Sequence, residues 1–238
     1  KNRLARFGDY LQILPGHGAG SACGKSLGAV PSTTLGYERK FNPAMKLALS
    51  DAAAFVKQIL EGQPDPPLYF SRMKQVNRDG IEVMGGIPKC GKLSVDEFLK
   101  LARDPAVKLI DTNSDRVAFD AAHVARAINA PLRSSFFTAA TGSFLSPEDR
   151  IILVLANEND ADLAVRQLYR IGFDNIAGWI TAGELQGSTG IISHTPRVQF
   201  SDFDPKAISA ESEILDVRTS AEFARSHLEG ARSIPYTR

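Results

Sequence analysis

The chain has 238 residues, 43% of them hydrophobic and 23% charged, which is typical of a globular protein of one to three domains. Its formal net charge is +1 and no basic stripe alternates with aromatic residues, so nucleic acid is not expected as a partner. The apolar runs are far shorter than the roughly 18 residues needed to span a bilayer, so we expect no membrane association and a cytoplasmic location.

The first predicted element is a short strand at residues 10–14 that runs directly into a glycine-rich turn, PGHGAGSACGK, at 15–25. This turn contains His17, Cys23 and Lys25. At the end of a strand, such side chains and free backbone N–H groups can converge on one ligand. The turn is therefore the first candidate site.

Residues 26–38 carry polar groups without helical periodicity and are predicted to form a loop. Asn42, followed by proline, is a typical helix N-cap and predicts one helix that ends near Gly62. A shorter amphipathic helix is predicted over 68–76. The stretch 80–91 contains four glycines and a proline, which indicates a linker.

A second unit begins with the capping-box pair Ser94 and Glu97, which predicts a helix to about residue 103. The apolar runs 107–110 and 151–155 are typical of parallel strands that are covered on both faces. Because strands alternate with helices, the sequence predicts a parallel α/β sheet. The other elements predicted in this unit are helices at 160–170 and 181–187 and a strand at 173–179.

The end of the chain repeats the start of this unit. The matching pairs are Asp111 with Asp216, Phe119 with Phe223, His123 with His227, Ala127 with Ala231 and Pro131 with Pro235. The two histidines lie 104 residues apart, the size of a small domain rather than of a solenoid repeat. We expect both histidines to anchor a turn through backbone hydrogen bonds, and we expect the second copy, which stops at Arg238, to be the truncated start of a domain.

The second copy, with Asp216-Val217-Arg218 and the turn at 230–235, resembles the signature that opens rhodanese domains, and the first copy resembles a degenerate version of it. In that family a cysteine carries sulfane sulfur at the head of a loop whose N–H groups lower the thiol pKa. The matching position here is Ala156, and three acidic residues stand in the loop 157–162. The resemblance therefore implies that the first rhodanese-like domain is not a sulfurtransferase.

The glycine-rich turn, together with TTLGYE at 33–38, resembles the C-terminal part of the metallo-β-lactamase-fold domain of persulfide dioxygenase and rhodanese fusion proteins, relatives of glyoxalase II. The fold class implied is α/β: the C-terminal part of a metallo-β-lactamase αββα fold, then a rhodanese-like parallel-sheet domain and the start of a second one. The implied divisions are a metallo-β-lactamase part at 1–80, a linker at 81–92, a rhodanese-like domain without its cysteine at 93–188, a linker at 189–204 and the second copy at 205–238.

This resemblance implies part of a non-haem-iron persulfide dioxygenase that oxidises glutathione persulfide, or another low-molecular-weight thiol persulfide, to sulfite. The cofactor would be Fe(II), or alternatively Zn²⁺, and most of its ligands would precede residue 1. His17 matches the last metal-site histidine of the fold. Cys23 is a candidate catalytic sulfur relay, while Lys25 and Tyr37 are candidates for binding the carboxylates and peptide of glutathione. The family also leaves room for a homo-oligomer.

Other interpretations remain open. The parent could be a zinc-dependent thioester hydrolase of the glyoxalase II type, or the chain could serve as a non-catalytic rhodanese-like docking module. His17 could simply be hydrogen-bonded within its turn, Cys23 could be a small buried hydrophobe, and Lys25 and Tyr37 could be ordinary surface residues. Cys23 and Cys90 lack CxxC spacing, so both are expected to be free, with Cys90 exposed in the linker.

Overall fold

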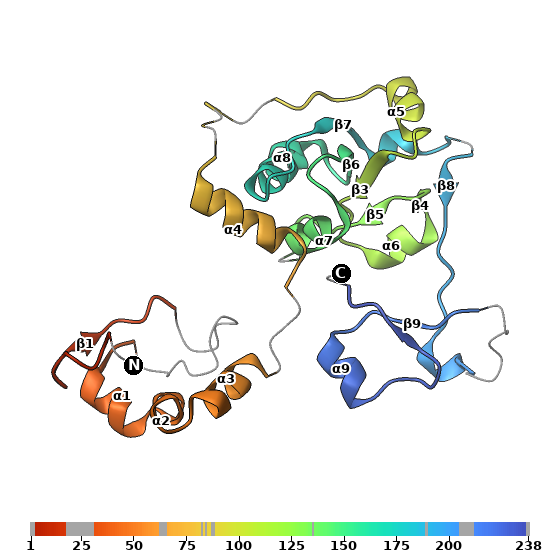
Figure 1. Ribbon diagram of the computed structural model, residues 1–238. Helices are drawn as coiled ribbons and strands as arrows, with labels where there is room; N and C mark the ends of the chain where they lie inside the picture. Colours follow the sequence, from red (N-terminus) through yellow and green to blue (C-terminus); the bar gives the residue numbers. More distant parts are fainter. Residues whose placement is uncertain are drawn as a thin grey trace. The chain divides into compact units, whose positions relative to one another are not determined.

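The computed structural model describes residues 3–17, 31–61, 66–81, 83, 85–86, 89–134, 136–188, 190–204 and 212–236. The chain divides into two compact units, Lys1–Pro64 and Asp65–Arg238, which are described separately below. Figure 1 traces both along the sequence, from red at the N-terminus to blue at the C-terminus. Cys23 and Lys25 lie outside the described residues.

The first unit is a small two-stranded sheet followed by helices. Its elements are β1 (Gln12–Ile13), β2 (Thr33–Thr34), α1 (Leu35–Phe41), α2 (Pro43–Ser50) and α3 (Ala52–Leu60). The strands β1 and β2 are antiparallel, and the N–H of Leu35 donates to the Leu11 carbonyl oxygen at 2.8 Å. Leu35 is fully buried. The strand predicted at 10–14 is confirmed in a shorter form.

Two predictions for this unit are wrong. The loop predicted at 26–38 contains β2 and the start of α1, because the Thr34 hydroxyl accepts the Tyr37 N–H at 3.3 Å and caps a helix there. The single helix predicted from Asn42 to Gly62 is two helices. The Asp51 carboxylate accepts the first free N–H groups of α3 at 2.9 and 3.0 Å, which ends α2 and begins a new helix. The N-cap role of Asn42 is confirmed.

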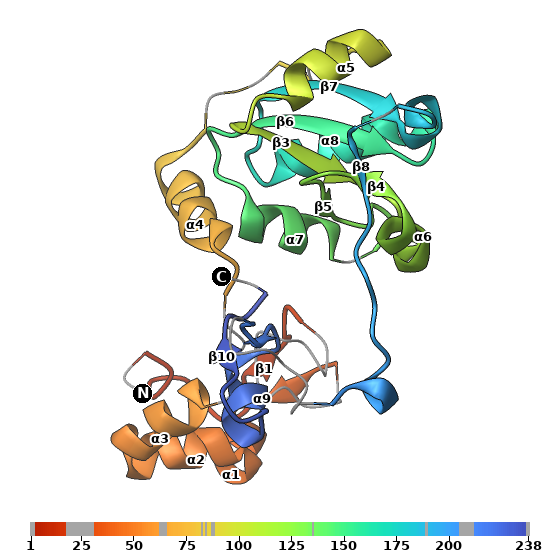
Figure 2. The same ribbon diagram turned by 90° about the vertical axis from the view of Figure 1, so that its right-hand side faces the viewer.

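The second unit alternates strands and helices. Its elements are α4 (Tyr69–Asp79), α5 (Val95–Ala102), β3 (Val107–Asp111), α6 (Arg116–Ala121), β4 (His123–Val124), β5 (Ile128–Asn129), α7 (Phe137–Phe144), β6 (Arg150–Leu155), η1 (Glu158–Asp160), α8 (Ala161–Arg170), β7 (Ile176–Thr181), η2 (Ala182–Leu185), β8 (Ile192–Ser193), η3 (Phe200–Asp202), β9 (Leu215–Asp216), α9 (Ser220–Arg225) and β10 (Arg232–Ser233). The order β5-β3-β6-β7 forms a parallel sheet, so the predicted α/β sheet is confirmed (Figure 2).

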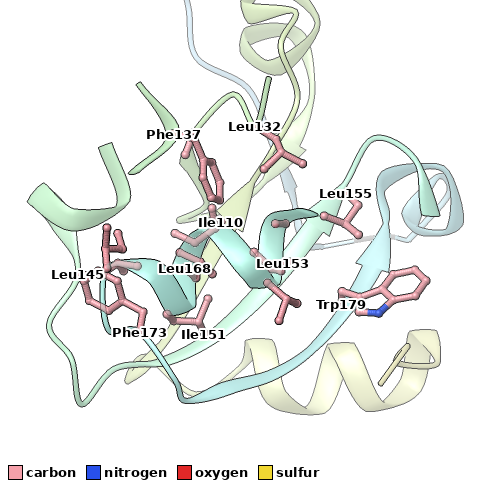
Figure 3. Close-up of a cluster of buried hydrophobic side chains, with 14 residues drawn as sticks. Ile110, Leu132, Phe137, Leu145, Ile151, Leu153, Leu155, Leu168, Phe173 and Trp179 are labelled. Carbon is pink, nitrogen blue, oxygen red and sulfur yellow. The ribbon is translucent and has the colours of Figure 1, made fainter. Parts of the chain in front are cut away.

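The sheet is covered on both faces. Along β6 the side chains alternate, so Ile151, Leu153 and Leu155 join one buried cluster and Ile152 and Val154 join the other. The first cluster is closed by α7 and α8, and Figure 3 shows its side chains from both helices meeting the strand. The second cluster is closed by Phe98 of α5, whose predicted capping box is present. Burial on both faces explains the continuous apolar run in the sequence.

Helix α4 belongs to the second unit and packs against the rest of it. Its Arg72 donates from Nη1 to the Gly172 carbonyl oxygen at 2.6 Å, and its Tyr69 packs against the first buried cluster. Cys90 also packs there and is half-buried, so the expectation that it lies exposed in a linker is wrong. The residues predicted as linker 81–92 therefore fall within the second unit. The structure divides the chain after Pro64, whereas the sequence predicts the domain boundary at residue 80.

The two copies of the repeat share their local structure. β9 pairs with β10 in parallel, as β3 pairs with β5, and each histidine stacks on a phenylalanine one helical turn earlier. His123 Nδ1 lies 2.7 Å from the Phe119 carbonyl oxygen, and His227 Nδ1 lies 2.8 Å from that of Phe223. The predicted anchoring role of both histidines is confirmed. Across the described part of the chain, no helix has the length and apolar character needed to cross a membrane.

Candidate functional site

Tyr37 lies in an open groove beside the small sheet of the first unit. The groove has a volume of about 580 Å³ and is lined by Tyr10, Gln12, Ser32, Thr33, Thr34 and Tyr37. The capped first turn of α1 holds the Tyr37 backbone, and its ring packs against Phe41 with 4.8 Å between centroids. Tyr37 is 57% exposed. The groove therefore presents phenol, hydroxyl and amide groups to a ligand, the chemistry that binds peptide and carboxylate oxygens.

His17 follows β1 and is exposed. Among the described residues, no group of three or more His, Cys, Asp or Glu side chains lies close enough together to hold a metal ion. At this place the described residues offer the single imidazole of His17 rather than a ligand set, and by themselves they do not fit a metal. Because Cys23 and Lys25 lie outside the described residues, their predicted convergence with His17 stays a prediction.

The loop that matches the rhodanese active site follows β6, and its acidic residues form ion pairs. Asp160 is 5% exposed and accepts a hydrogen bond from Arg133 Nη2 at 2.5 Å. Glu158 pairs with Lys92, whose Nζ lies 3.0 Å away. The position of the missing cysteine, Ala156, is exposed at the head of this loop. Two of the three acidic groups are thereby neutralised within the protein.

Lys92 links this loop to the end of the sheet. Its Nζ also lies 3.2 Å from Glu184 and 5.4 Å from the centroid of the Trp179 ring, a cation–π geometry. The carboxylates of Glu158 and Glu184 raise the pKa of Lys92, and the Thr181 hydroxyl, followed by other donors, lowers the pKa of Glu184. A lysine between two carboxylates and an aromatic face keeps its positive charge. Through Glu158 and Glu184, Lys92 ties the loop after β6 to the segment after β7.

A cavity that the sequence did not predict lies at the carboxyl ends of β3 and β6, with a volume of about 430 Å³. Asp111 and His123 line it. Asp111 is 5% exposed, and its carboxylate accepts the Asn113 N–H at 2.8 Å. Burial raises the pKa of Asp111, while the Asn113 N–H and the charge of His123 oppose that shift. The only signal in the sequence was an aspartate that ends a buried strand.

Cys90 is a free thiol whose pKa is raised by burial. A buried thiol in apolar surroundings carries little thiolate at neutral pH, and thiolate is the reactive form. Trp179 donates from Nε1 to the Cys90 carbonyl oxygen at 3.2 Å, which holds the backbone here against the sheet. These contacts favour a structural role for Cys90.

No protein-family model and no curated protein matches this chain. Among solved structures, it is similar to a metallo-beta-lactamase from Staphylococcus aureus subsp. aureus COL, with 31% identity and a TM-score of 0.54. The match covers 76% of this chain and 47% of that one, so the chain spans about half the length of that relative. Since the second unit holds 174 of the 238 residues (65–238), or 73%, the match includes residues of both units.

Two further solved structures are more distant. A rhodanese-like domain of the Alr3790 protein from Anabaena sp. is 17% identical, with a TM-score of 0.38, and the match covers 51% of this chain and 94% of that one. The wild-type structure of EanB is 17% identical, with a TM-score of 0.37, over 64% of this chain and 42% of that one. Similarity at this level adds no argument of its own.

The predicted α/β fold class with a parallel sheet is confirmed, and the chain is similar over 76% of its length to a metallo-beta-lactamase. The candidate groove at Tyr37 lies in the unit Lys1–Pro64, and the loop at Ala156 lies in the unit Asp65–Arg238.

Proposed function

We propose that this chain is part of a non-haem-iron persulfide dioxygenase fused to rhodanese modules. The observation that carries the proposal is the match to a metallo-beta-lactamase at 31% identity, because that match includes residues of both units. A metal-dependent enzyme of this fold joined to a rhodanese-like domain fits chemistry on sulfur carried by a small thiol.

The reaction proposed is RS–S⁻ + O₂ + H₂O → RSH + SO₃²⁻ + H⁺, in which the terminal sulfur is oxidised and O₂ is reduced. Fe(II) would supply the oxygen chemistry. His17 is the candidate ligand in this chain, with the remaining ligands contributed by other parts of the protein. The described residues hold no complete ligand set.

The proposed task of the chain's own residues is to bind the thiol carrier. Tyr37 would hold the peptide or carboxylates of glutathione in the groove, with the hydroxyls of Thr33 and Thr34 nearby. Lys25 would pair with a carboxylate, and Cys23 would relay sulfur. Hydrogen bonds of this kind bind substrate and transition state alike, so their loss raises KM more than it lowers kcat.

The test is metal analysis and O₂ uptake by the full-length protein supplied with glutathione persulfide, with sulfite measured alongside. We expect iron and one sulfite formed per O₂ consumed. For Tyr37→Phe we expect KM to rise by about fivefold with kcat nearly unchanged, as for a lost neutral hydrogen bond. Tyr236→Phe, at an exposed tyrosine that does not line the groove, is the control for a general effect of removing a hydroxyl. Zinc, no O₂ uptake and hydrolysis of a glutathione thioester would instead establish the hydrolase.

We further propose that the rhodanese-like domain is a non-catalytic docking or structural module. The loop at Ala156 supports this proposal. Its Glu158 forms an ion pair with Lys92, and its Asp160 forms one with Arg133. An anionic persulfide placed there would find the cations Lys92 and Arg133 already engaged by these carboxylates. The fixed loop, and not only the missing thiol, should prevent sulfur transfer.

Ala156→Cys separates these two causes. We expect the variant to fold and to show no thiosulfate sulfurtransferase activity. In the matched triple variant Ala156→Cys, Glu158→Gln, Asp160→Asn, removal of the two charges should lower the pKa of the introduced thiol relative to the single variant. Sulfurtransferase activity in the single variant at the level of an ordinary rhodanese would contradict the proposal.

A further inference from the structure

The two copies of the repeat place an aspartate at the same position. Asp111 pairs with Asn129 across β3 and β5, and Asp216 pairs with Ser233 across β9 and β10. Each carboxylate also accepts the backbone N–H of the residue two positions later, at 2.8 Å in the first copy and 3.0 Å in the second. The two carboxylates are therefore structurally equivalent.

In the second copy a cation occupies the space beside this carboxylate. The guanidinium of Arg218 contacts Asp216 with Nε at 3.0 and 3.2 Å and with Nη2 at 2.6 Å. Nη2 also donates to the Ser226 carbonyl oxygen at 2.8 Å. The side chain thus bridges the end of the strand and the turn that follows α9.

The first copy lacks this cation. Asn113 stands at the position of Arg218, and its side chain accepts the Asp115 N–H at 3.0 Å in the turn before α6. Within the described part of the chain, no lysine or arginine forms an ion pair with Asp111, and the charged group that acts on it is His123. Asp111 is 5% exposed, so a carboxylate with no lysine or arginine beside it is favoured by a further cationic donor.

A cavity of about 430 Å³ lies beside the Asp111 carboxylate. Ala122, which stands where Ser226 lies in the second copy, lines it together with Asp111 and His123. Its apolar walls include Val154 and Leu185. None of its lining residues comes from the loop 156–162, so it is distinct from the rhodanese-type site. The volume lies in the range of about 300–1,000 Å³ that is usual for small-ligand sites.

His123 also lines this cavity. A carbonyl oxygen only accepts, so the 2.7 Å contact between Nδ1 and the Phe119 oxygen places a hydrogen on Nδ1 and fixes the orientation of the ring. The cavity therefore sets a carboxylate and an imidazole among apolar walls.

We propose that this cavity binds a small organic cation, a guanidinium group on a short apolar body, with the guanidinium on Asp111 as the Arg218 guanidinium lies on Asp216 in the second copy. The Asp111 carboxylate receives two N–H groups in the bidentate geometry that guanidinium favours. The apolar walls contact the body of the ligand. This binding site is independent of the proposed dioxygenase reaction.

The test titrates methylguanidinium into the full chain and follows the amide signal of Asn113 by NMR, because that N–H donates to Asp111. A saturable shift is expected with a Kd of about 1 mM, a realistic affinity for a ligand with five heavy atoms. Methylurea, the neutral analogue of similar shape, should give no saturable shift. Asp111→Asn should weaken binding at least tenfold.

Asn113→Arg provides a second variant that does not remove the carboxylate. Its guanidinium should fill the cavity, so the variant should fold and lose methylguanidinium binding. Asp216→Asn, in the copy that already has its arginine, is the matched control and should bind like the wild type. The proposal is overturned if methylguanidinium gives no saturable shift, if methylurea binds equally well, or if Asp111→Asn or a folded Asn113→Arg binds like the wild type.

Discussion

At the scale of single residues, Asp111 and Asp216 show how one neighbour sets the electrostatics of a carboxyl group. Arg218 holds the pKa of Asp216 below its usual range, whereas burial raises the pKa of Asp111. The two positions share their strand register and their backbone hydrogen bond. The difference therefore comes from Asn113 in place of Arg218 and from the depth of burial.

This contrast predicts a pH dependence of stability. Because the pKa of Asp111 is higher in the folded than in the unfolded chain, its favourable contribution is complete below about pH 3.9 and is lost as the pH rises through the folded value. Urea unfolding between pH 3.5 and about pH 7 should show the wild type losing stability relative to Asp111→Asn over that rise. A wild-type advantage that grows with pH would contradict the assignment.

The sequence identifies the residues of the repeat, but it does not predict the cavity at Asp111 in the first copy. The role of His123 was predictable because the same histidine recurs with the same spacing, and the structure confirms its bond to Phe119. The replacement of Arg218 by Asn113 is visible in the sequence. Its consequence is not, because it depends on how deeply Asp111 is buried, which is set by tertiary packing.

At the scale of elements, the predictions succeed where burial imposes a pattern. The strand β6 was predictable because both of its faces are covered. The helix α7 was not predicted, since its sequence FTAATGSF combines weak helix formers and begins without a side-chain cap. Its Thr141 hydroxyl bonds back to the Phe137 carbonyl oxygen, which satisfies a polar group in a buried helix.

The break at Asp51 leads to a prediction with a definite sign. If α2 and α3 are separate helices, Asp51→Ala removes the N-cap of α3 and should destabilise the first unit by about 1 kcal/mol, while Asp51→Asn, which can still cap, should cost a few tenths at most. Hydrogen exchange at the amides of Ala53 and Ala54 should accelerate in the alanine variant alone. In a continuous helix, alanine would instead be stabilising at this position.

At the scale of the whole molecule, the chain joins two units whose boundary differs from the one that the sequence suggests. The linker composition of 80–91 indicates a division near residue 80, because glycine and proline commonly mark such segments. The structure divides the chain after Pro64, with α4 in the second unit. Local composition could not reveal this, since the contacts of Tyr69 and Arg72 are with residues far along the chain.

Tyr69 and Gly142 together test where α4 belongs. A Cβ built on Gly142 would lie 2.9 Å from Cγ of Tyr69 and closer still to other ring atoms, so the two residues can coexist only because one is glycine. Gly142→Ala should therefore destabilise the second unit by about 1–3 kcal/mol, despite the gain in helix propensity that alanine brings to α7.

The sign of this effect should reverse when the ring is removed. In a Tyr69→Ala background, the clash is absent and Gly142→Ala should stabilise α7 by up to about 1 kcal/mol, so a double-mutant cycle on the full chain should give a large coupling free energy. Val117→Ala, at an exposed site of the same unit, controls for general effects and should change stability by less than about 0.5 kcal/mol. If α4 instead belongs to the first domain, Gly142→Ala will be stabilising in both backgrounds and the coupling will vanish, which places the boundary near residue 80.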